Sequence, residues 1–232
     1  MRNLKRTLSL ALASVMLVGM MSVGASAVNA SDFTDADEIV NKDAVSTMTA
    51  LGIINGKEDG SYFDPTGNVT RAEMAKMLCV AINGGVDPVL GVKDTPTFTD
   101  IKGTWAESYI EYCAANGIIA GRGNNKFDPT GTVSATEAAK MLLGVLGYSA
   151  EKSGLVGNDW AINTNVLANQ NGLYKKLANL NANTLLTRDN AAQMIYNALD
   201  ANMVELNAAG NYTTSQYSYT GTESVVTGNE RV

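Results

Sequence analysis

The sequence predicts an all-α protein made of tandem helix–loop–helix repeats, and three observations support this. The stretch from Tyr62 to Leu78 combines a turn, a helix start and an apolar helical stripe. The same stretch returns 64 residues later, where Phe127 takes the place of Phe63. A third, degraded version surrounds Thr187. Internal repeats of this length indicate supersecondary units that bury their apolar faces against one another.

The first copy of the stretch is a turn followed by a capped helix. Asp64-Pro65-Thr66-Gly67 has Pro at i+1 and Gly at i+3, which favours a type I turn. Thr70 fits an N-cap, and Glu73 three residues later completes a capping box. Apolar residues then recur with the spacing of one buried helical face: Met74, Met77, Leu78, Ala81 and Ile82.

The second and third copies keep different parts of this pattern. Ser134 and Glu137 rebuild the capping box of the second copy. In the third copy, Thr187 and Arg188 stand where Thr70 and Arg71 stand in the first. The Phe-Asp-Pro-Thr-Gly turn is missing there, and a Leu/Asn/Ala-rich stretch at 174–184 replaces it.

Each copy also has an earlier helix, which completes the helix–loop–helix unit. The first is expected at 38–50 and the second at 105–116, each ended by a glycine suited to the position after a helix. In the first, four apolar residues are expected to face inward: Val40, Ala44, Val45 and Met48. The repeats are therefore placed at 32–83, 98–148 and 149–200, with a linker at 84–97 and an irregular or β-prone tail at 201–232.

Residues 1–27 have the features of a secretory signal peptide. A basic start precedes an apolar run at 8–24, and Ala25-Ser26-Ala27 fits a cleavage site. The alternative, a retained membrane helix, is disfavoured because the run is shorter than the roughly 20 residues that a span needs. We expect a secreted protein at the cell wall or cell surface, with no membrane insertion after cleavage.

Composition excludes several classes of function. Removal of residues 1–27 changes the formal charge from −6 to −9, because 14 basic residues then face 23 acidic ones. This charge argues against nucleic acid as a partner. The absence of histidine removes the commonest general base and metal ligand. Cys79 and Cys113 lie in apolar helical stretches, so buried free thiols are favoured over a disulfide.

Arg71 is the one motif residue that capping does not explain. A cation in the first turn of a helix faces the positive end of the helix dipole, at a cost of a few tenths of a kcal/mol. An exposed, tolerated arginine is one interpretation, and an anionic ligand that compensates the charge is the other.

The repeats closely resemble the S-layer homology domain, three tandem copies of which anchor exported proteins to bacterial cell walls. The resemblance rests on Phe-Thr-Asp, Trp-Ala, Gly-Ile-Ile, Phe-x-Pro and Val-Thr-Arg-Ala-Glu, in that order, and covers residues 32–200. It implies three copies packed about a pseudo-threefold axis, with ligand grooves between neighbours. It also implies a non-catalytic module without cofactor or metal that binds an anionic secondary cell-wall polysaccharide linked to peptidoglycan, often one with a pyruvate ketal. Self-association in a surface layer is a further implied role.

The same resemblance implies which side chains contact the glycan. These are the motif arginines, the tryptophans, the aspartates of Phe-x-Asp and the basic residues of the glycine-flanked loops: Arg71, Arg188, Trp105, Trp160, Asp35, Asp100, Arg122 and Lys57. Their chemistry fits, since a guanidinium pairs with a carboxylate and an indole face suits a sugar ring. Each also has a plain structural interpretation: core tryptophans, turn-capping aspartates and solvated loop charges.

No copy carries the full motif set. Ala135 stands where the second copy should have arginine, and Val40 stands where the first should have tryptophan. A groove assembled across neighbours, for example from Arg71 and Trp105, remains available. We therefore expect one or two working grooves.

Three other functions are considered. A calcium loop at 64–70 has alternating oxygen ligands but lacks the glycine and the final glutamate that an EF-hand requires. A wall hydrolase would need paired catalytic carboxylates or a nucleophile with its base. A structural or protein-interaction module without glycan binding is the main alternative.

Overall fold

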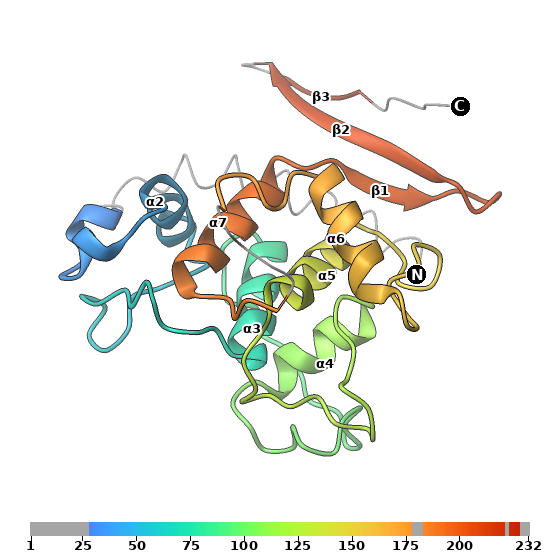
Figure 1. Ribbon diagram of the computed structural model, residues 1–232, viewed down its shortest axis with the longest axis horizontal. Helices are drawn as coiled ribbons and strands as arrows, with labels where there is room; N and C mark the ends of the chain where they lie inside the picture. The colour runs from blue at the N-terminus through green and yellow to red at the C-terminus, as the bar shows by residue number, and fades with distance from the viewer. Residues whose placement is uncertain (1–27, 178–182, 221–222, 228–232) are drawn as a thin grey trace.

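The computed structural model describes residues 28–177, 183–220 and 223–227, and its helices form a single bundle with a small sheet along one side (Figure 1). The predicted signal peptide at 1–27 lies outside the described residues. Two short 3-10 helices come first, η1 (Ala30–Asp32) and η2 (Ala36–Glu38). The α-helices follow in chain order: α2 (Lys42–Ala50), α3 (Arg71–Ile82), α4 (Glu107–Ala115), α5 (Ala135–Val145), α6 (Trp160–Gln170) and α7 (Arg188–Leu199).

A closed ring of backbone hydrogen bonds joins the three repeats. The N–H of Val69 donates to the carbonyl of Leu186, that of Leu186 to Val133, and that of Val133 to Val69, each at 2.9 Å. Val69, Val133 and Leu186 precede α3, α5 and α7, respectively, at the same place in each repeat. The ring is direct evidence for the pseudo-threefold arrangement that the family resemblance implies.

The helices pair between repeats. The second helix of each repeat packs against the first helix of the next: α3 on α4, and α5 on α6. The last pair, α7 on α2, closes the circle between the third repeat and the first. In that pair both the backbone N–H and the side-chain Nδ2 of Asn41 donate to Asp189, at 3.0 and 2.6 Å. The helix pairs therefore form a closed circle through all three repeats.

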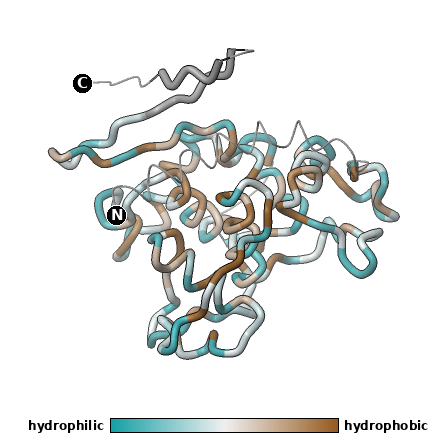
Figure 2. The backbone as a smooth tube through the Cα atoms, turned by 180° about the vertical axis from the view of Figure 1, so that it is seen from behind, coloured by the Kyte–Doolittle hydropathy of each residue, from teal (hydrophilic) through white to brown (hydrophobic). Residues whose placement is uncertain are grey.

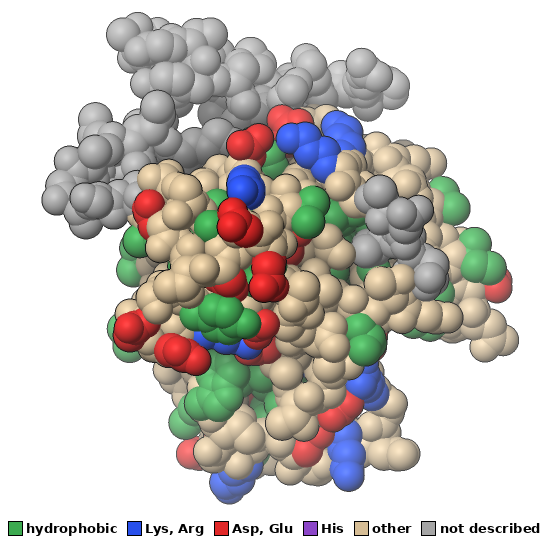
Figure 3. All heavy atoms as spheres, turned by 60° about the vertical axis from the view of Figure 1, so that its left-hand side comes forward, with side chains coloured by type: hydrophobic (Ala, Val, Ile, Leu, Met, Phe, Trp, Pro, Cys, Tyr) green, Lys and Arg blue, Asp and Glu red, His purple; other side chains and the backbone are tan. Residues whose placement is uncertain are grey.

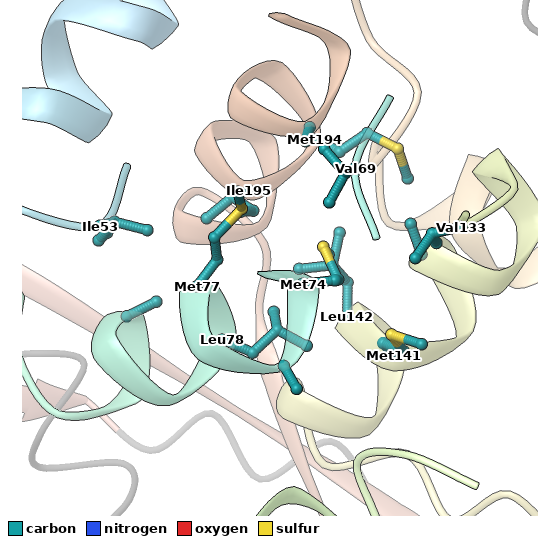
Figure 4. Close-up of a cluster of buried hydrophobic side chains, with 14 of the residues drawn as sticks. Ile53, Val69, Met74, Met77, Leu78, Val133, Met141, Leu142, Met194 and Ile195 are labelled. Carbon is teal, nitrogen blue, oxygen red and sulfur yellow. The ribbon is translucent and has the colours of Figure 1, made fainter. Parts of the chain in front are cut away.

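The core lies where α3, α5 and α7 converge on the axis of the ring (Figure 4). Met77, Met141 and Met194 occupy the same position in their repeats, and all three are buried. Val69 and Val133, from the hydrogen-bonded ring, are fully buried beside them. Figure 2 shows the matching pattern along the chain, with hydrophobic segments gathered in the helices and hydrophilic ones in the outer loops.

The capping boxes and turns are as predicted. Thr70 Oγ1 accepts from the N–H of Glu73, and the Glu73 carboxylate accepts from the N–H of Thr70 at 2.7 Å. Ser134 and Glu137 make the same pair of bonds. The turn at Asp64 closes through the N–H of Gly67, which donates to the Asp64 carbonyl at 3.1 Å.

Two predicted helix starts and one side-chain orientation are wrong. The helix predicted at 38–50 begins at Lys42, because the chain makes a 3-10 turn at Ala36–Glu38 first. Val40, expected to face inward, is 82% exposed because it precedes the helix and lies outside its apolar stripe. The helix predicted from Trp105 begins at Glu107.

The tail forms an antiparallel sheet, in agreement with the predicted β tendency. Its strands are β1 (Met203–Leu206), β2 (Tyr212–Thr220) and β3 (Glu223–Thr227), paired in that order. The N–H of Val204 donates to the carbonyl of Leu146 at 2.8 Å. The rings of Tyr148 and Tyr212 lie 5.1 Å apart. These contacts attach the sheet to the end of α5.

Cys79 and Cys113 meet in the interface between α3 and α4. Both are buried free thiols, as favoured from the sequence, and their Sγ atoms lie 3.3 Å apart. Cys79 Sγ also lies 3.5 Å from the carbonyl oxygen of Tyr109, and Cys113 Sγ lies 3.6 Å from that of Ala75. The hydrogen bond with Cys79 and burial raise the pKa of Cys113, so this thiol is protonated near neutral pH.

The surface mixes charges of both signs. On the face shown in Figure 3, basic and acidic side chains are interspersed. Within the described ranges, no helix combines the length and the hydrophobicity needed to cross a membrane. The same residues contain no group of three or more acidic or cysteine side chains placed to hold a metal ion.

Candidate functional site

The two motif arginines reach into the loop of the following repeat. Arg71 Nε donates to the carbonyl of Phe127, and its Nη2 donates to that of Ala120, both at 2.7 Å. Arg188 repeats this geometry on Phe63 and Asn55, at 2.7 and 2.8 Å. The arginines are 3% and 5% exposed, respectively. Each one therefore links two repeats.

Each arginine also lies over an aromatic ring of the loop that it binds. Arg71 Cζ is 4.3 Å from the centroid of the Phe127 ring, and Arg188 Cζ is 5.0 Å from that of Phe63. The leading Phe of the Phe-x-Pro turn thus supplies both a carbonyl and a ring face for the arginine. This pairing explains two motif losses together. The second repeat has Ala135 in place of the arginine, and the third repeat, which that arginine would bind, lacks the Phe-x-Pro turn.

These contacts explain why a cation is tolerated at Arg71, in the first turn of α3. Its charge is met by two carbonyl oxygens and by Glu137, whose Oε1 lies 3.5 Å from Nη1. Burial lowers the pKa of Arg71, and the charge of Glu137 opposes that shift. The unfavourable helix dipole therefore does not require a ligand to explain this residue.

The two motif aspartates fasten the same turns. Asp35 accepts hydrogen bonds from the N–H groups of Phe63 and Asp64, at 2.9 and 2.7 Å. Asp100 accepts from those of Phe127 and Asp128, both at 2.8 Å. Both carboxylates thus already bind backbone inside the protein, at the Phe-x-Pro turn and not at the start of the first helix of their repeat.

Asp100 links this turn to the pH dependence of stability. Burial tends to raise the pKa of Asp100, but hydrogen bonds from Phe127 and Asp128 outweigh it and hold the pKa below its ordinary value. A depressed pKa in the folded state stabilises the protein above about pH 4, the unfolded value, and this stabilisation is lost as pH falls through the folded pKa.

We expect Asp100→Asn to lower the free energy of unfolding by about 1–2 kcal/mol at pH 7, because the amide can accept only one of the two backbone bonds. The difference from wild type should shrink below about pH 4. Denaturant titrations at neutral pH and at a pH well below that value measure both effects. An equal deficit under both conditions would contradict the assigned role of the carboxylate.

The loop cations Arg122 and Lys57 are paired with carboxylates. Arg122 Nη2 lies 2.8 and 3.0 Å from the two oxygens of Glu137, and Nη1 lies 2.6 Å from Asp128. Lys57 forms an ion pair with Asp64 at the equivalent position. The side chains of Arg122 and Lys57 are 37% and 39% exposed. Of the predicted basic residues, these two are open to solvent.

Each tryptophan lies near an aromatic–lysine contact: Lys140 meets the ring of Trp160 itself, whereas Lys76 meets Tyr109, the neighbour of Trp105. Trp105 is 60% exposed, which excludes the core interpretation, and its ring is 6.3 Å from that of Tyr109. Lys76 Nζ lies 5.5 Å from the centroid of the Tyr109 ring. Trp160 is half-buried, and Lys140 Nζ lies 5.2 Å from its ring centroid.

Two clusters result, and each draws on all three repeats. The Arg71 cluster consists of Arg71, Arg122, Asp128, Glu137, Lys140 and Trp160. The Arg188 cluster consists of Arg188, Lys57, Asp64, Glu73, Lys76 and, beyond it, Tyr109 and Trp105. Lys140 joins the first set because both Arg71 and Glu137 act on its charge. In the second, Lys76 lies one turn after Glu73 on α3.

The combination of Arg71 with Trp105, expected from the sequence, is not the one that the structure makes. Arg71 binds Ala120 beyond the end of α4, whereas Trp105 precedes its start. The nine residues of α4 span about 13 Å, so the two side chains lie at opposite ends of that helix. Trp160 is the tryptophan of the Arg71 cluster.

The third equivalent position lacks both key residues. The N–H of Ala135 donates to Thr184 at 2.9 Å, as Arg71 and Arg188 do to Gly131 and Gly67. The tryptophan equivalent beside α7 is Val40, next to Asn41, which binds Asp189. Ala135 and Val40, the replacements for arginine and tryptophan, come from different repeats but belong to the same position between repeats. The other two clusters therefore keep both their arginine and their tryptophan.

Lys76, Lys140, Tyr109 and Asp128 are not among the residues that the sequence motifs single out. The lysines carry a usable signal, because they recur 64 residues apart, three residues after the capping glutamates. Tyr109 carries none, since its equivalent in the third repeat is Thr164.

Comparison with known proteins agrees with this architecture. The family model of the S-layer homology domain matches residues 32–75 and 97–139. The chain is 30% identical over 113 residues to an S-layer protein of Bacillus licheniformis, covering 49% of this chain and 12% of that protein. It is 28% identical over 207 residues to a cell surface protein of Thermoanaerobacter kivui, covering 88% and 26%. It is also 28% identical over 156 residues to Exoglucanase XynX of Acetivibrio thermocellus, covering 63% and 14%. The chain thus spans at most 26% of these relatives.

Proposed function

We propose that this chain binds an anionic secondary cell-wall polysaccharide. Its residues 32–75 and 97–139 belong to the S-layer homology domain family, so the chain carries a cell-surface anchoring module. A polymer linked to peptidoglycan, such as one with pyruvylated sugars, has the required charge. The relatives include both an S-layer protein and an exoglucanase, which fits a module joined to different cargo.

The observation that carries the proposal is the pairing of an indole face with unburied cations in two clusters. Trp160 and Trp105 offer flat apolar faces to the C–H side of a sugar ring. Arg122 and Lys57 offer solvent-exposed cations in the same clusters. These two kinds of contact match the apolar C–H face and the negative charge of an anionic sugar.

The roles of the predicted residues differ under this proposal. Trp105, Trp160, Arg122 and Lys57 contact the ligand directly. Arg71 and Arg188, which are almost fully buried, position the loops, and each presents at most one guanidinium edge to the ligand. Asp35 and Asp100 fasten the turns from which those loops start.

We expect Trp105→Ala and Trp160→Ala each to weaken binding to purified cell-wall sacculi by about tenfold, as hot-spot aromatics do. The double variant should lose binding altogether. Val40→Ala is the matched control, because it changes the third equivalent position, which is 82% exposed and has no arginine beside it. Cosedimentation before and after the secondary polymer is stripped measures the effect.

The structural alternative predicts a different result. If the repeats serve only to hold each other or another protein, the double tryptophan variant will cosediment with sacculi as wild type does. The buried, purely internal contacts of Arg71 and Arg188 are the observation that favours this alternative. Binding that also survives removal of the polymer would contradict glycan recognition.

A further inference from the structure

The two clusters differ in how their lysines are neutralised. Lys76 and Lys140 occupy the same place in their repeats, each beside an aromatic ring. Lys76 Nζ lies 3.0 Å from Asp87 Oδ2, so an acidic partner already meets its charge. In the part of the chain that the structure describes, Lys140 has no carboxylate within ion-pair distance.

The surroundings of Lys140 disfavour its charged, protonated form. Burial lowers the pKa of Lys140, and the nearby charge of Arg71 lowers it further. The charge of Glu137 opposes this shift, but its oxygens already bind Arg122 and the N–H of Ser134. A half-buried ammonium beside a second cation favours the arrival of an anion.

The charge balance of the clusters points the same way. Arg71, Arg122 and Lys140 face the carboxylates of Asp128 and Glu137, which leaves one positive charge. In the other cluster, Arg188, Lys57 and Lys76 face Asp64 and Glu73, and Asp87, which lies outside the cluster as defined, pairs with Lys76, so no positive charge is left over. Asp35 and Asp100 occupy equivalent positions in the two clusters and do not change the comparison.

We propose that the Arg71 cluster is the stronger anion-binding site of the module, with Lys140 as the charge partner of the ligand and Trp160 as the platform for its sugar ring. The Arg188 cluster is the weaker site because Asp87 competes with the ligand for Lys76. The ligand is a sugar bearing a carboxylate or phosphate. This inference rests on the proposed function and adds an order between the two clusters.

The test compares matched variants for binding to the isolated, soluble wall polymer, by titration calorimetry on the full chain. We expect Lys140→Met to weaken binding about tenfold and Lys76→Met less than about threefold, since a partly desolvated ion pair is worth more than one already satisfied. Methionine keeps the stem over the aromatic ring. Asp87→Asn should strengthen binding several-fold, because it frees Lys76 while keeping an acceptor for Tyr109. Equal losses in the two lysine variants, or no gain with Asp87→Asn, would overturn the order.

Two controls separate this inference from the proposed function. If the double tryptophan variant loses binding but Lys140→Met does not, the order is wrong and the polysaccharide function stands. If the double tryptophan variant binds normally, the function itself is wrong. Amidation of the polymer with a carbodiimide and an amine removes carboxylates and leaves phosphodiesters, so it distinguishes the two sources of negative charge.

Discussion

A chain that ends after residue 148 is expected not to fold. It would retain both repeats that match the family model, yet it would lack the third member of the backbone ring and the partners of α2 and α5. The side chains removed include four buried apolar ones: Leu173, Leu186, Met194 and Ile195. Their burial is worth about 6–12 kcal/mol, which equals the whole stability of a typical domain.

Circular dichroism during thermal and urea unfolding measures this result. The truncated chain should show no cooperative transition, whereas a chain that ends after residue 202 should keep one. The longer chain is the control, because it removes only the sheet and leaves α6 and α7 in place. A cooperative transition in the shorter chain would mean that the first two repeats fold as an independent unit.

The local parts of this architecture could be predicted from residue patterns, whereas the closed arrangement of the three repeats followed only from the family resemblance. Caps and turns at Thr70, Ser134 and Asp64 depend on residues three positions apart, so their patterns are readable. The pairing of α7 with α2 joins segments that are distant in the sequence, as the bond between Asn41 and Asp189, 148 residues apart, illustrates. No periodicity within one helix indicates which helix it will meet.

In the candidate site, too, the local features could be predicted and the long-range grouping could not. The positions of the tryptophans and loop cations follow from the repeat pattern, but their grouping does not. The sequence suggests Trp105 as the partner of Arg71 because consecutive repeats are expected to share a site. The cross-repeat packing carries Arg71 instead to the cluster that holds Trp160. The inward orientation predicted for Val40 is wrong because the helix begins only at Lys42, so the helical spacing of Ala44 and Val45 does not extend back to Val40.

The interpretation of the motif arginines through the helix dipole is a local argument. Their actual partners are carbonyl oxygens of the next repeat, 49 and 56 residues away for Arg71. Such long-range bonds leave no trace in composition or spacing. The coincidence of Ala135 with a missing Phe-x-Pro turn is the available clue, because an arginine and the turn that it binds depend on each other.

Arg71→Ala is expected to lower the free energy of unfolding by about 3–5 kcal/mol, because two buried carbonyls lose their donor and Glu137 loses part of its positive surroundings. In a chain of this size, each kcal/mol shifts the melting temperature by about 2–4 °C, so a fall of roughly 10 °C follows. Scanning calorimetry measures it. Arg188→Ala should behave alike, since Arg188 makes the two equivalent bonds to backbone carbonyls, on Phe63 and Asn55.

Arg122→Ala is the matched control for this destabilisation. Its guanidinium also binds carboxylates, but the side chain is 37% exposed, and exposed ion pairs contribute at most about 1 kcal/mol. Similar losses for Arg71→Ala and Arg122→Ala would contradict the buried, loop-holding role. The expected difference also determines how binding experiments must be interpreted. A motif-arginine variant that no longer binds the wall has disturbed loops as well as a missing cation. Only a surface variant such as Arg122→Ala or Trp105→Ala can therefore separate recognition from folding.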